Sequence, residues 1–440
     1  MDEVVLNSLV RLMSRFSGRA AVDSRLVMPG DVFFAMQGQK TDGHHFLCEA
    51  AAKGAKAAVV SKTYAGPDCG LALLGVEDPL DALQQIAARL LSQRKTKIVA
   101  VTGSLGKTTT KGFISALLKQ KYRTGDSPGN SNSQTSLPLT ILNHTSGEEE
   151  VLVLEMGMTH PGQILRLTQI APPDIAVITK TAPVHFCNFS SLADISRAKG
   201  EILSHPRVSL GIISRDIEVF DEIKHIGTCL KQSFSTTQPD ADYYVHEEGK
   251  QLKITTPSER VALPSLVVAG KHNLHNFMAA VAVARALGLS WEEIAAAMPL
   301  LKLPERRFQE VIKQGVLFIN DAYNASVMSM KAALESLPKP KPGGKAIAVL
   351  GEMRELGVLS ETSHLEVGEF SLEYIDSMIC VGEKCKPINE IWRRAKRASC
   401  WVMTLDEATM ELRRQISPGD VVLVKGANGL CLWRLLESFD

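Results

Sequence analysis

The sequence lacks any Cys-x-x-Cys pair, although it contains eight cysteines in 440 residues. Cysteines scattered in this way do not predict a zinc site, and we expect reduced thiols and a cytoplasmic location. No apolar run reaches the length of a transmembrane helix, and the acidic start Met1-Asp2-Glu3 does not resemble a signal peptide. The sequence also lacks an excess of charge of either sign, since it contains 49 basic and 48 acidic residues. We therefore expect no membrane span and no nucleic acid partner.

What the chain does contain is enough apolar sequence, 45% of its residues, to bury several cores. Its length predicts about three domains, with boundaries at 1–92, 93–303 and 304–440. Strand-like runs alternate with helical segments, which predicts an α/β fold with mostly parallel sheets and a second doubly wound sheet in the last domain. The expected strands are 32–36, 57–60, 98–101, 151–154, 175–179, 211–214, 266–269, 316–320, 346–350, 378–381 and 421–424, with antiparallel structure at 243–256.

The stretch 97–111 combines a β-branched run, a glycine-rich turn and the start of a helix. The turn, Gly103-Ser104-Leu105-Gly106, lets backbone N–H groups approach phosphate oxygens, and the helix N-terminus favours the negative charge. Lys107 would balance the β- and γ-phosphates, and the Thr108 hydroxyl would bind Mg²⁺. Val101 stands where the eight-residue Walker pattern has its first glycine, so an ordinary strand-to-helix turn is the alternative.

Three further residues could complete such a site. Glu155 ends the predicted strand 151–154, where a carboxylate beside a phosphate loop can bind Mg²⁺; a surface glutamate is the alternative. His185 follows the strand at 175–179 and would face the same rim, although a lone histidine is more often structural. Lys199 lies in a predicted helix, and taken alone it is an ordinary solvated lysine.

Other polar groups also gather where predicted elements begin or end. Asn273 and Asn276 are three residues apart, so both can look out from one helix face toward an adenine edge or a phosphate, or cap the helix. Segments 320–324, 351–357 and 425–426 follow three strands of the last domain and predict a ligand-facing edge. The polar loop 37–45 follows a strand of the first domain, where ligand binding and simple turn formation both remain open.

The order of these motifs resembles the Mur ligases of bacterial cell-wall synthesis, over nearly the whole chain. The residues that carry the resemblance are Thr102-Gly103-x-x-Gly106-Lys107-Thr108, Leu154-Glu155-Met156-Gly157, Ala182-Pro183-x-His185, Ala198-Lys199-Gly200-Glu201-Ile202, Gly270-x-His272-Asn273-x-x-Asn276 and Asp321-x-Tyr323-Asn324. In the first domain, Asp23-Ser24-Arg25, Pro29-Gly30-Asp31 and Gly38-x-x-x-Asp42-Gly43-His44 resemble the family's uridine-binding domain. Residues 349–357 resemble the branch that adds D-alanyl-D-alanine.

The resemblance implies an α/β fold of three domains: a small α/β uridine-binding domain, a central P-loop domain, and a Rossmann-like C-terminal domain that binds D-alanyl-D-alanine and closes on ATP. The implied activity is the ATP-dependent joining of D-alanyl-D-alanine to UDP-N-acetylmuramoyl-tripeptide through an acyl phosphate, by a monomer. The implied cofactors are two Mg²⁺ ions and a CO₂-derived carbamate on Lys199. The implied catalytic residues are Lys107, Glu155, His185 and Lys199.

The same resemblance implies three sets of contacts. ATP would be bound by Thr102, Gly103, Ser104, Leu105, Gly106, Lys107, Thr108, Thr109, Asn273, Asn276, Arg307 and Asp321. Metal would be held by Thr108, Glu155, His185 and carbamylated Lys199. The UDP-linked substrate would be bound by Ser24, Arg25, Gly38, Asp42, His44 and Asn132. The sequence departs from the family at Ser133, Gln163, Arg306 and Ala427.

Three other functions remain as alternatives. The sibling ligase that adds the diamino acid carries an Asp-Asn-Pro-Arg signature, which is absent here. A folylpolyglutamate synthetase-like ligase would lack a domain equivalent to 1–92. A P-loop regulator that binds ATP without ligating anything would not need His185 and Lys199 beside Lys107.

Overall fold

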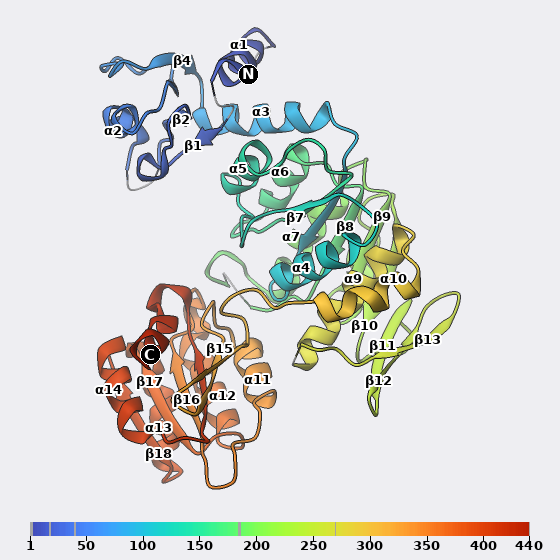
Figure 1. Ribbon diagram of the computed structural model, residues 1–440, viewed down its shortest axis with the longest axis vertical. Helices are drawn as coiled ribbons and strands as arrows, with labels where there is room; N and C mark the ends of the chain where they lie inside the picture. Colours follow the sequence, from blue (N-terminus) through green and yellow to red (C-terminus); the bar gives the residue numbers. More distant parts are fainter. Residues whose placement is uncertain (1–2, 17–18, 39–40, 184–185, 269, 440) are drawn as a thin grey trace.

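The structure is a computed structural model, and it describes residues 3–16, 19–38, 41–183, 186–268 and 270–439. Three β-sheets follow one another along the chain, and Figure 1 shows them in three separate parts of the molecule along its longest axis. The first sheet contains strands β1–β4, the second β5–β13 and the third β14–β19. Among the described residues no helix is long and apolar enough to cross a membrane.

The N-terminal sheet is parallel, in the order β1-β2-β3-β4. Its strands are β1 (Ala20–Ala21), β2 (Val32–Phe34), β3 (Ala57–Ser61) and β4 (Ala72–Val76), and its helices are α1 (Glu3–Arg15), α2 (Leu47–Ala52) and α3 (Pro79–Ser92). Because strand side chains alternate, Val32 and Phe34 face one apolar cluster while Phe33 faces another. The predicted strands in this domain are confirmed, with bounds shifted by one or two residues.

A disulfide joins Cys48 of α2 to Cys69 in the loop before β4. The two Cα atoms are 5.0 Å apart, within the usual range for a bridged pair. The expectation of reduced thiols is therefore wrong for this pair, because the fold brings together two cysteines that no sequence spacing relates. The other six cysteines are free.

The central sheet has nine strands in the order β13-β12-β11-β10-β9-β8-β5-β7-β6. The strands are β5 (Lys97–Thr102), β6 (Thr124–Asp126), β7 (Val151–Glu155), β8 (Ile175–Ile178), β9 (Leu210–Ser214), β10 (Leu230–Ser235), β11 (Tyr243–Glu248), β12 (Gln251–Thr255) and β13 (Arg260–Pro264). From the β6 edge through β7, β5, β8, β9 and β10 to β11, all neighbouring strands pair in parallel. Strand β12 pairs antiparallel with both β11 and β13, which confirms the antiparallel structure expected at 243–256.

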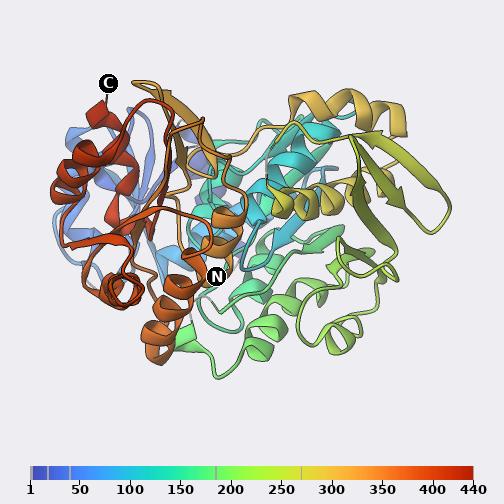
Figure 2. The same cartoon turned by 90° about the horizontal axis from the view of Figure 1, so that it is seen from below.

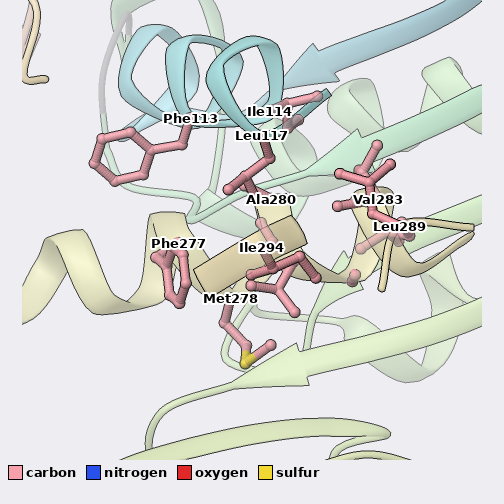
Figure 3. Packing of buried hydrophobic residues seen from close by; sticks show 14 of the residues in the cluster. Phe113, Ile114, Leu117, Phe277, Met278, Ala280, Val283, Leu289 and Ile294 are labelled. Carbon is pink, nitrogen blue, oxygen red and sulfur yellow. The ribbon is translucent and has the colours of Figure 1, made fainter. Parts of the chain in front are cut away.

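The helices of this domain are α4 (Lys107–Leu118), α5 (Ser136–Asn143), α6 (Gln163–Ile170), α7 (Leu192–Gly200), α8 (Phe220–Ile223), α9 (Lys271–Ala286) and α10 (Trp291–Ala297). Figure 3 shows Phe113, Ile114 and Leu117 of α4 pointing toward α9, where Phe277 and Ala280 meet them. All five side chains are fully buried. This packing holds the helix that follows the P-loop against the helix that carries Asn273 and Asn276.

The strand expected at 266–269 is wrong for residues 266–268, and residue 269 lies outside the described part of the chain. Leu266 and Val268 pack on the core of α4 and α9, but Val267 is 65% exposed. The segment is an apolar linker that runs beside the core without pairing to a strand. The sheet edge is instead formed by the less apolar strand β13.

The C-terminal sheet has the order β14-β15-β19-β16-β17-β18, with β14 antiparallel to β15 and the rest parallel. Its strands are β14 (Gln309–Lys313), β15 (Val316–Asn320), β16 (Ala346–Gly351), β17 (Ser377–Val381), β18 (Ala398–Val402) and β19 (Val421–Lys425), and its α-helices are α11 (Val327–Glu335), α12 (Ser360–Ser371), α13 (Lys386–Arg394) and α14 (Leu405–Gln415). Helices cover both faces of the sheet, and Figure 2 shows this domain beside the central one. The predicted second doubly wound sheet is confirmed.

Candidate active site

A cavity of about 630 Å³ lies where the P-loop, the carboxyl ends of β7 and β8, the start of α9 and the C-terminal domain meet. Because β5 lies between β7 and β8, the loop after β5 has the end of β7 on one side and the end of β8 on the other. This is the edge at which open parallel sheets bind ligands. The predicted residues that line the cavity are Gly103, Ser104, Leu105, Gly106, Lys107, Thr108, Thr109, Asn132, Glu155, Lys199, Asn273, Asn276, Arg307 and Asp321.

The glycines of the P-loop have specific roles. Gly106 has φ +82°, and a Cβ there would lie 2.2 Å from Asn276 Oδ1, so both the backbone conformation and the close helix require glycine. The Ser104 and Leu105 N–H groups donate to the carbonyl of Lys180, at 2.7 and 3.3 Å. These two N–H groups of the turn are therefore already hydrogen-bonded within the protein, whereas the N–H groups at the start of α4 remain as donors for an anion.

Lys107 folds back over its own loop. Its Nζ donates to the carbonyls of Gly103 at 2.8 Å and Ser104 at 3.3 Å. Burial lowers the pKa of Lys107, and the nearby carboxylate of Glu155 opposes this shift. The ammonium is thus held at the phosphate loop by two weak acceptors that a phosphate can replace.

Glu155 is the carboxylate at the centre of the site and is only 1% exposed. Thr108 Oγ1 donates to its Oε2 at 2.8 Å, and Asn132 Nδ2 donates to its Oε1 at 2.7 Å. Arg307 Nη2 in turn donates to Thr108 Oγ1 at 3.0 Å. The predicted metal residues Thr108 and Glu155 are therefore in direct contact, and the C-terminal domain reaches them.

Lys199, on α7, is 2% exposed and lines the same cavity. Burial lowers its pKa well below the ordinary value, and the positive charge of Lys107 lowers it further. Its amine is consequently held in an environment that disfavours the charged form. His185 lies outside the described residues. Among the described residues no group of three or more His, Cys, Asp and Glu side chains could hold a metal ion.

In the C-terminal domain, Asp321 is engaged on two sides. Its Oδ2 lies 2.6 Å from Lys425 Nζ, and its Oδ1 accepts the N–H of Phe308 at 3.0 Å. The guanidinium of Arg307 lies over the ring of Tyr323, 4.1 Å from its centroid. Two polar strand ends expected to form a ligand-facing edge, at 320–324 and at Lys425, thus meet at the cavity.

The predicted uridine-binding residues of the first domain lie elsewhere. None of Ser24, Arg25, Gly38, Asp42 and His44 is among the described residues that line the cavity. Both ring nitrogens of His44 have partners, since Nδ1 lies 2.6 Å from Asp42 Oδ1 and Nε2 accepts the N–H of Ser61. His44 therefore braces its own loop, whereas the Arg25 side chain is 79% exposed and pairs with Asp23.

Thr102 is also absent from the cavity lining, because it is fully buried at the end of β5. Sequence reasoning assigned no role to four residues at the site, namely Lys111, Asn130, Lys180 and His275. For Lys180 a signal was present, because it follows the strand expected at 175–179 directly. For Lys111 there was none, because its partner loop forms only in the folded chain.

Three family models match the chain: Mur ligase family, catalytic domain, at residues 20–90; Mur ligase middle domain at 101–284; and Mur ligase, glutamate ligase domain, at 306–428. The UDP-N-acetylmuramoyl-tripeptide–D-alanyl-D-alanine ligase of Bacillus subtilis (strain 168) is 34% identical over 429 residues, which are 95% of this chain and 92% of that protein.

Solved structures agree with these matches. MurF from Acinetobacter baumannii has a TM-score of 0.85 and 29% identity, with 96% of this chain and 93% of that one covered. The MurF ligase from Thermotoga maritima in complex with ADP has a TM-score of 0.81 and 30% identity, with 97% of each chain covered. The fold class and the resemblance read from the motifs are confirmed, and the chain belongs to the Mur ligase family.

Proposed function

We propose that this chain is an ATP-dependent ligase of peptidoglycan synthesis that joins D-alanyl-D-alanine to UDP-N-acetylmuramoyl-tripeptide. The observation that carries the proposal is the single cavity in which the P-loop, Glu155 and Lys199 meet Arg307 of the C-terminal domain. The names of the curated relative and of the two solved structures support the reaction and its nucleotide.

The reaction needs two displacements and no protein nucleophile. The terminal carboxylate of the tripeptide attacks the γ-phosphorus of ATP, the bond to the β-phosphate oxygen breaks, and ADP leaves. The amine of D-alanyl-D-alanine then attacks the acyl phosphate, loses a proton, and expels inorganic phosphate as the amide forms. Positioning and charge neutralisation therefore supply the catalysis. Lys107 and the N–H groups at the start of α4 would hold the phosphates during both steps.

The oxygen ligands of the site fit Mg²⁺, which is commonly bound by one or two carboxylates together with substrate phosphates. Glu155 and Thr108 would hold one ion, and the second would lie toward Lys199 and His185. When bound, Mg²⁺ would neutralise the charge that develops on the transferred phosphoryl group. Asn132 would keep the Glu155 carboxylate oriented through its 2.7 Å hydrogen bond.

We propose that CO₂ carbamylates Lys199. The lowered pKa of this buried lysine supports the proposal, because only a neutral amine attacks CO₂. The product is an anion with two oxygens, which would face the metal where a protonated lysine would repel it. Protein incubated with ¹³C-bicarbonate should show a carbamate carbon signal that is absent from Lys199→Ala; a signal of equal size in that variant would remove Lys199 as its source.

The remaining roles follow from the three domains. The N-terminal domain would bind the uridine end of the substrate, the central domain ATP, and the C-terminal domain the incoming dipeptide. Contacts between the N-terminal and central domains support a fixed geometry, since Arg166 Nη2 lies 2.5 Å from Asp81 Oδ1 and Asn143 Nδ2 donates to the Ala20 carbonyl at 2.8 Å. A monomer and a cytoplasmic location stay predictions.

The decisive experiment supplies the enzyme with ATP, Mg²⁺ and UDP-N-acetylmuramoyl-tripeptide and measures phosphate release with and without D-alanyl-D-alanine. Release that depends on the dipeptide supports the proposal. Release that depends instead on a diamino acid, with the UDP-linked dipeptide as acceptor, would identify the sibling ligase, and glutamate-dependent release with a folate would identify the folylpolyglutamate type. Phosphate release at the same rate with and without each of these added substrates would indicate a P-loop regulator.

Lys199→Ala separates chemistry from nucleotide binding. It should abolish turnover and leave ADP affinity nearly unchanged, because Lys199 is proposed to act at the metal and not at a phosphate. The matched control is Lys224→Ala on the outer surface, where the lysine pairs with Asp221. Unchanged turnover in Lys199→Ala would remove this residue from the mechanism.

A further inference from the structure

Lys180 is tied to the P-loop by its backbone. It follows β8, and its carbonyl accepts the N–H groups of Ser104 and Leu105. An isolated antiparallel bridge pairs Lys180 with Leu105, which places the two Cα atoms about 5 Å apart. The residue is therefore a fixed part of the wall of the phosphate loop, on the side away from Glu155.

The bridge between Leu105 and Lys180 leaves fewer backbone N–H groups for phosphate binding. Two N–H groups that a glycine-rich loop would normally direct at an anion are already used. At the same place the chain adds a lysine side chain, which is partly exposed and lines the cavity. The N–H groups of Ser104 and Leu105 are thus not available to an anion, and the Lys180 ammonium is a positive charge next to them.

No acidic side chain in the described part of the chain forms an ion pair with the Lys180 ammonium. Its charge reaches His272 and His275 at the start of α9, where it helps to lower two pKa values that burial already lowers. Neither histidine can supply the negative charge that would neutralise the Lys180 ammonium. A cation that opens into a cavity without a carboxylate partner is arranged to meet an anionic ligand.

We infer that Lys180 is a second phosphate-binding lysine of the nucleotide site. It would contact the α- or β-phosphate from the β8 side. Lys107 and the Mg²⁺ ion proposed at Glu155 would contact the γ-phosphate. Lys180 lines the same cavity as Asn273 and Asn276 of α9, the proposed nucleoside contacts, and as the P-loop. This inference rests on the proposed ATP site and goes beyond it by adding a ligand.

Direct binding tests the inference without the ligase reaction. Calorimetry would measure the affinities of ADP, AMP and adenosine for the wild-type chain, Lys180→Gln, Lys180→Arg and the control Lys231→Gln. Lys231 is a partly exposed lysine on β10 of the same sheet, and its Nζ donates to the carbonyl of Cys229 outside the cavity lining. Thermal unfolding of each variant would verify that it folds.

Lys180→Gln should weaken ADP binding roughly 10- to 100-fold, the loss expected for one charge-assisted hydrogen bond, and leave adenosine binding unchanged. Lys180→Arg should restore most of the affinity, and Lys231→Gln should behave as wild type. Weakened AMP binding would assign the contact to the α-phosphate, and unchanged AMP binding to the β-phosphate. ADP affinity within about twofold of wild type, or an equal loss for adenosine, would overturn the inference.

The proposed function can fail separately. If the wild-type chain binds ADP and Lys180→Gln does not, but no acceptor stimulates phosphate release, the lysine assignment stands and the ligase assignment falls. If the wild-type chain binds neither ADP, AMP nor adenosine, the proposed ATP site is wrong and the inference falls with it.

Discussion

Arg307 of the C-terminal domain donates to Thr108 of the P-loop across 3.0 Å, although 199 residues separate them in the sequence. The same hydroxyl donates to Glu155. A guanidinium and a metal ion cannot both lie against one small hydroxyl, since like charges repel strongly in a partly buried site. In the proposed complex, Mg²⁺ at Thr108 would displace Arg307, and the phosphates of ATP would be the anions that receive its guanidinium.

Arg307→Ala is expected to lower kcat/KM for ATP about 100-fold, because it removes a cation from the transferred phosphate. The adjacent Arg306→Ala is a matched control, since Arg306 lies over Trp433, 4.0 Å from the ring centroid, and is not among the described residues that line the cavity. Steady-state kinetics with varied ATP would measure both. A loss in Arg306→Ala as large as in Arg307→Ala would point to disruption of the linker between domains instead.

Lys111 is expected to position the metal carboxylate from a distance. It is 4% exposed, and its Nζ donates to the carbonyls of Ser127 and, at 2.7 Å, Gly129. These contacts hold the loop that brings Asn132 to Glu155. Burial lowers the pKa of Lys111, and the nearby carboxylates of Glu155 and Asp126 oppose that shift.

Lys111→Met should raise the Mg²⁺ concentration for half-maximal activity about tenfold, in addition to a stability loss of about 1–3 kcal/mol from the two orphaned carbonyls. Lys119→Met provides the control, because Lys119 directly follows the same helix, its side chain is 56% exposed, and its Nζ lies 3.8 Å from Asp126. Titration of activity with Mg²⁺ distinguishes the two roles. If Lys111→Met loses stability but keeps the wild-type Mg²⁺ dependence, Lys111 is structural only.

Local sequence patterns were sufficient for most of the inner strands and for the part of the site that lies at strand ends, but they did not predict the edge strands β1, β4, β6, β13, β14 and β18 or the inner strand β10. Glu155 could be placed because a buried run of β-branched and leucine residues ends at it, and parallel strands deliver their carboxyl ends to one edge. Contacts between segments that are far apart in the chain could not be predicted in this way. The Arg307–Thr108 contact depends on how two domains pack, and the Lys111 contact depends on the course of the loop at 127–132.

Local patterns also misled where a residue type has two uses. The run Leu266-Val267-Val268 has the composition of a strand, but it packs on a helix pair and has no strand partner. His44 stands in a loop suited to ligand binding, yet its two ring nitrogens are used within the domain. For the run at 266–268 the composition was interpreted correctly and the partner was not, because partners come from tertiary structure; the uridine-binding role of His44 stays a prediction.

Asp216 makes the stability of the central domain depend on pH. Burial would raise its pKa, but the His275 ring 3.4 Å from Oδ2 and hydrogen bonds from the Ser235 and Thr237 hydroxyls to Oδ1 outweigh this and lower it from 3.8 to about 2. The folded pKa is below the unfolded one, so the stabilisation is complete above pH 3.8 and is lost as pH falls toward about 2. Its size is about 2 kcal/mol.

Asp216→Asn should therefore be destabilised by about 2 kcal/mol near neutral pH, and the gap to wild type should narrow as pH falls below about 4. Denaturant unfolding at a series of pH values measures this gap. Asp240→Asn is the control. The Asp240 side chain is 65% exposed, and its 3.6 Å ion pair with Arg215 is a weak surface contact. A gap that keeps the same size down to pH 3 would contradict the assignment to the Asp216 carboxylate.

The disulfide between Cys48 and Cys69 makes the N-terminal domain sensitive to reductant. The bond closes a loop of 21 residues between α2 and the approach to β4. Closing a loop of this length restricts the unfolded chain and contributes about 3 kcal/mol. α2 follows directly on the loop that carries Asp42 and His44, so reduction should loosen the predicted uridine-binding region before the distant phosphate site.

Unfolded protein prepared without reductant should react with thiol reagents at six cysteines, and reduced protein at all eight. Cys69→Ser should lower the unfolding temperature of the N-terminal domain and raise KM for the UDP-linked substrate more than KM for ATP, because the loss is local. Cys187→Ser, at an exposed free cysteine, should change neither. Eight reactive thiols in the unreduced protein would show that the bridge does not form, and equal increases in both KM values would show that its effect extends beyond this domain.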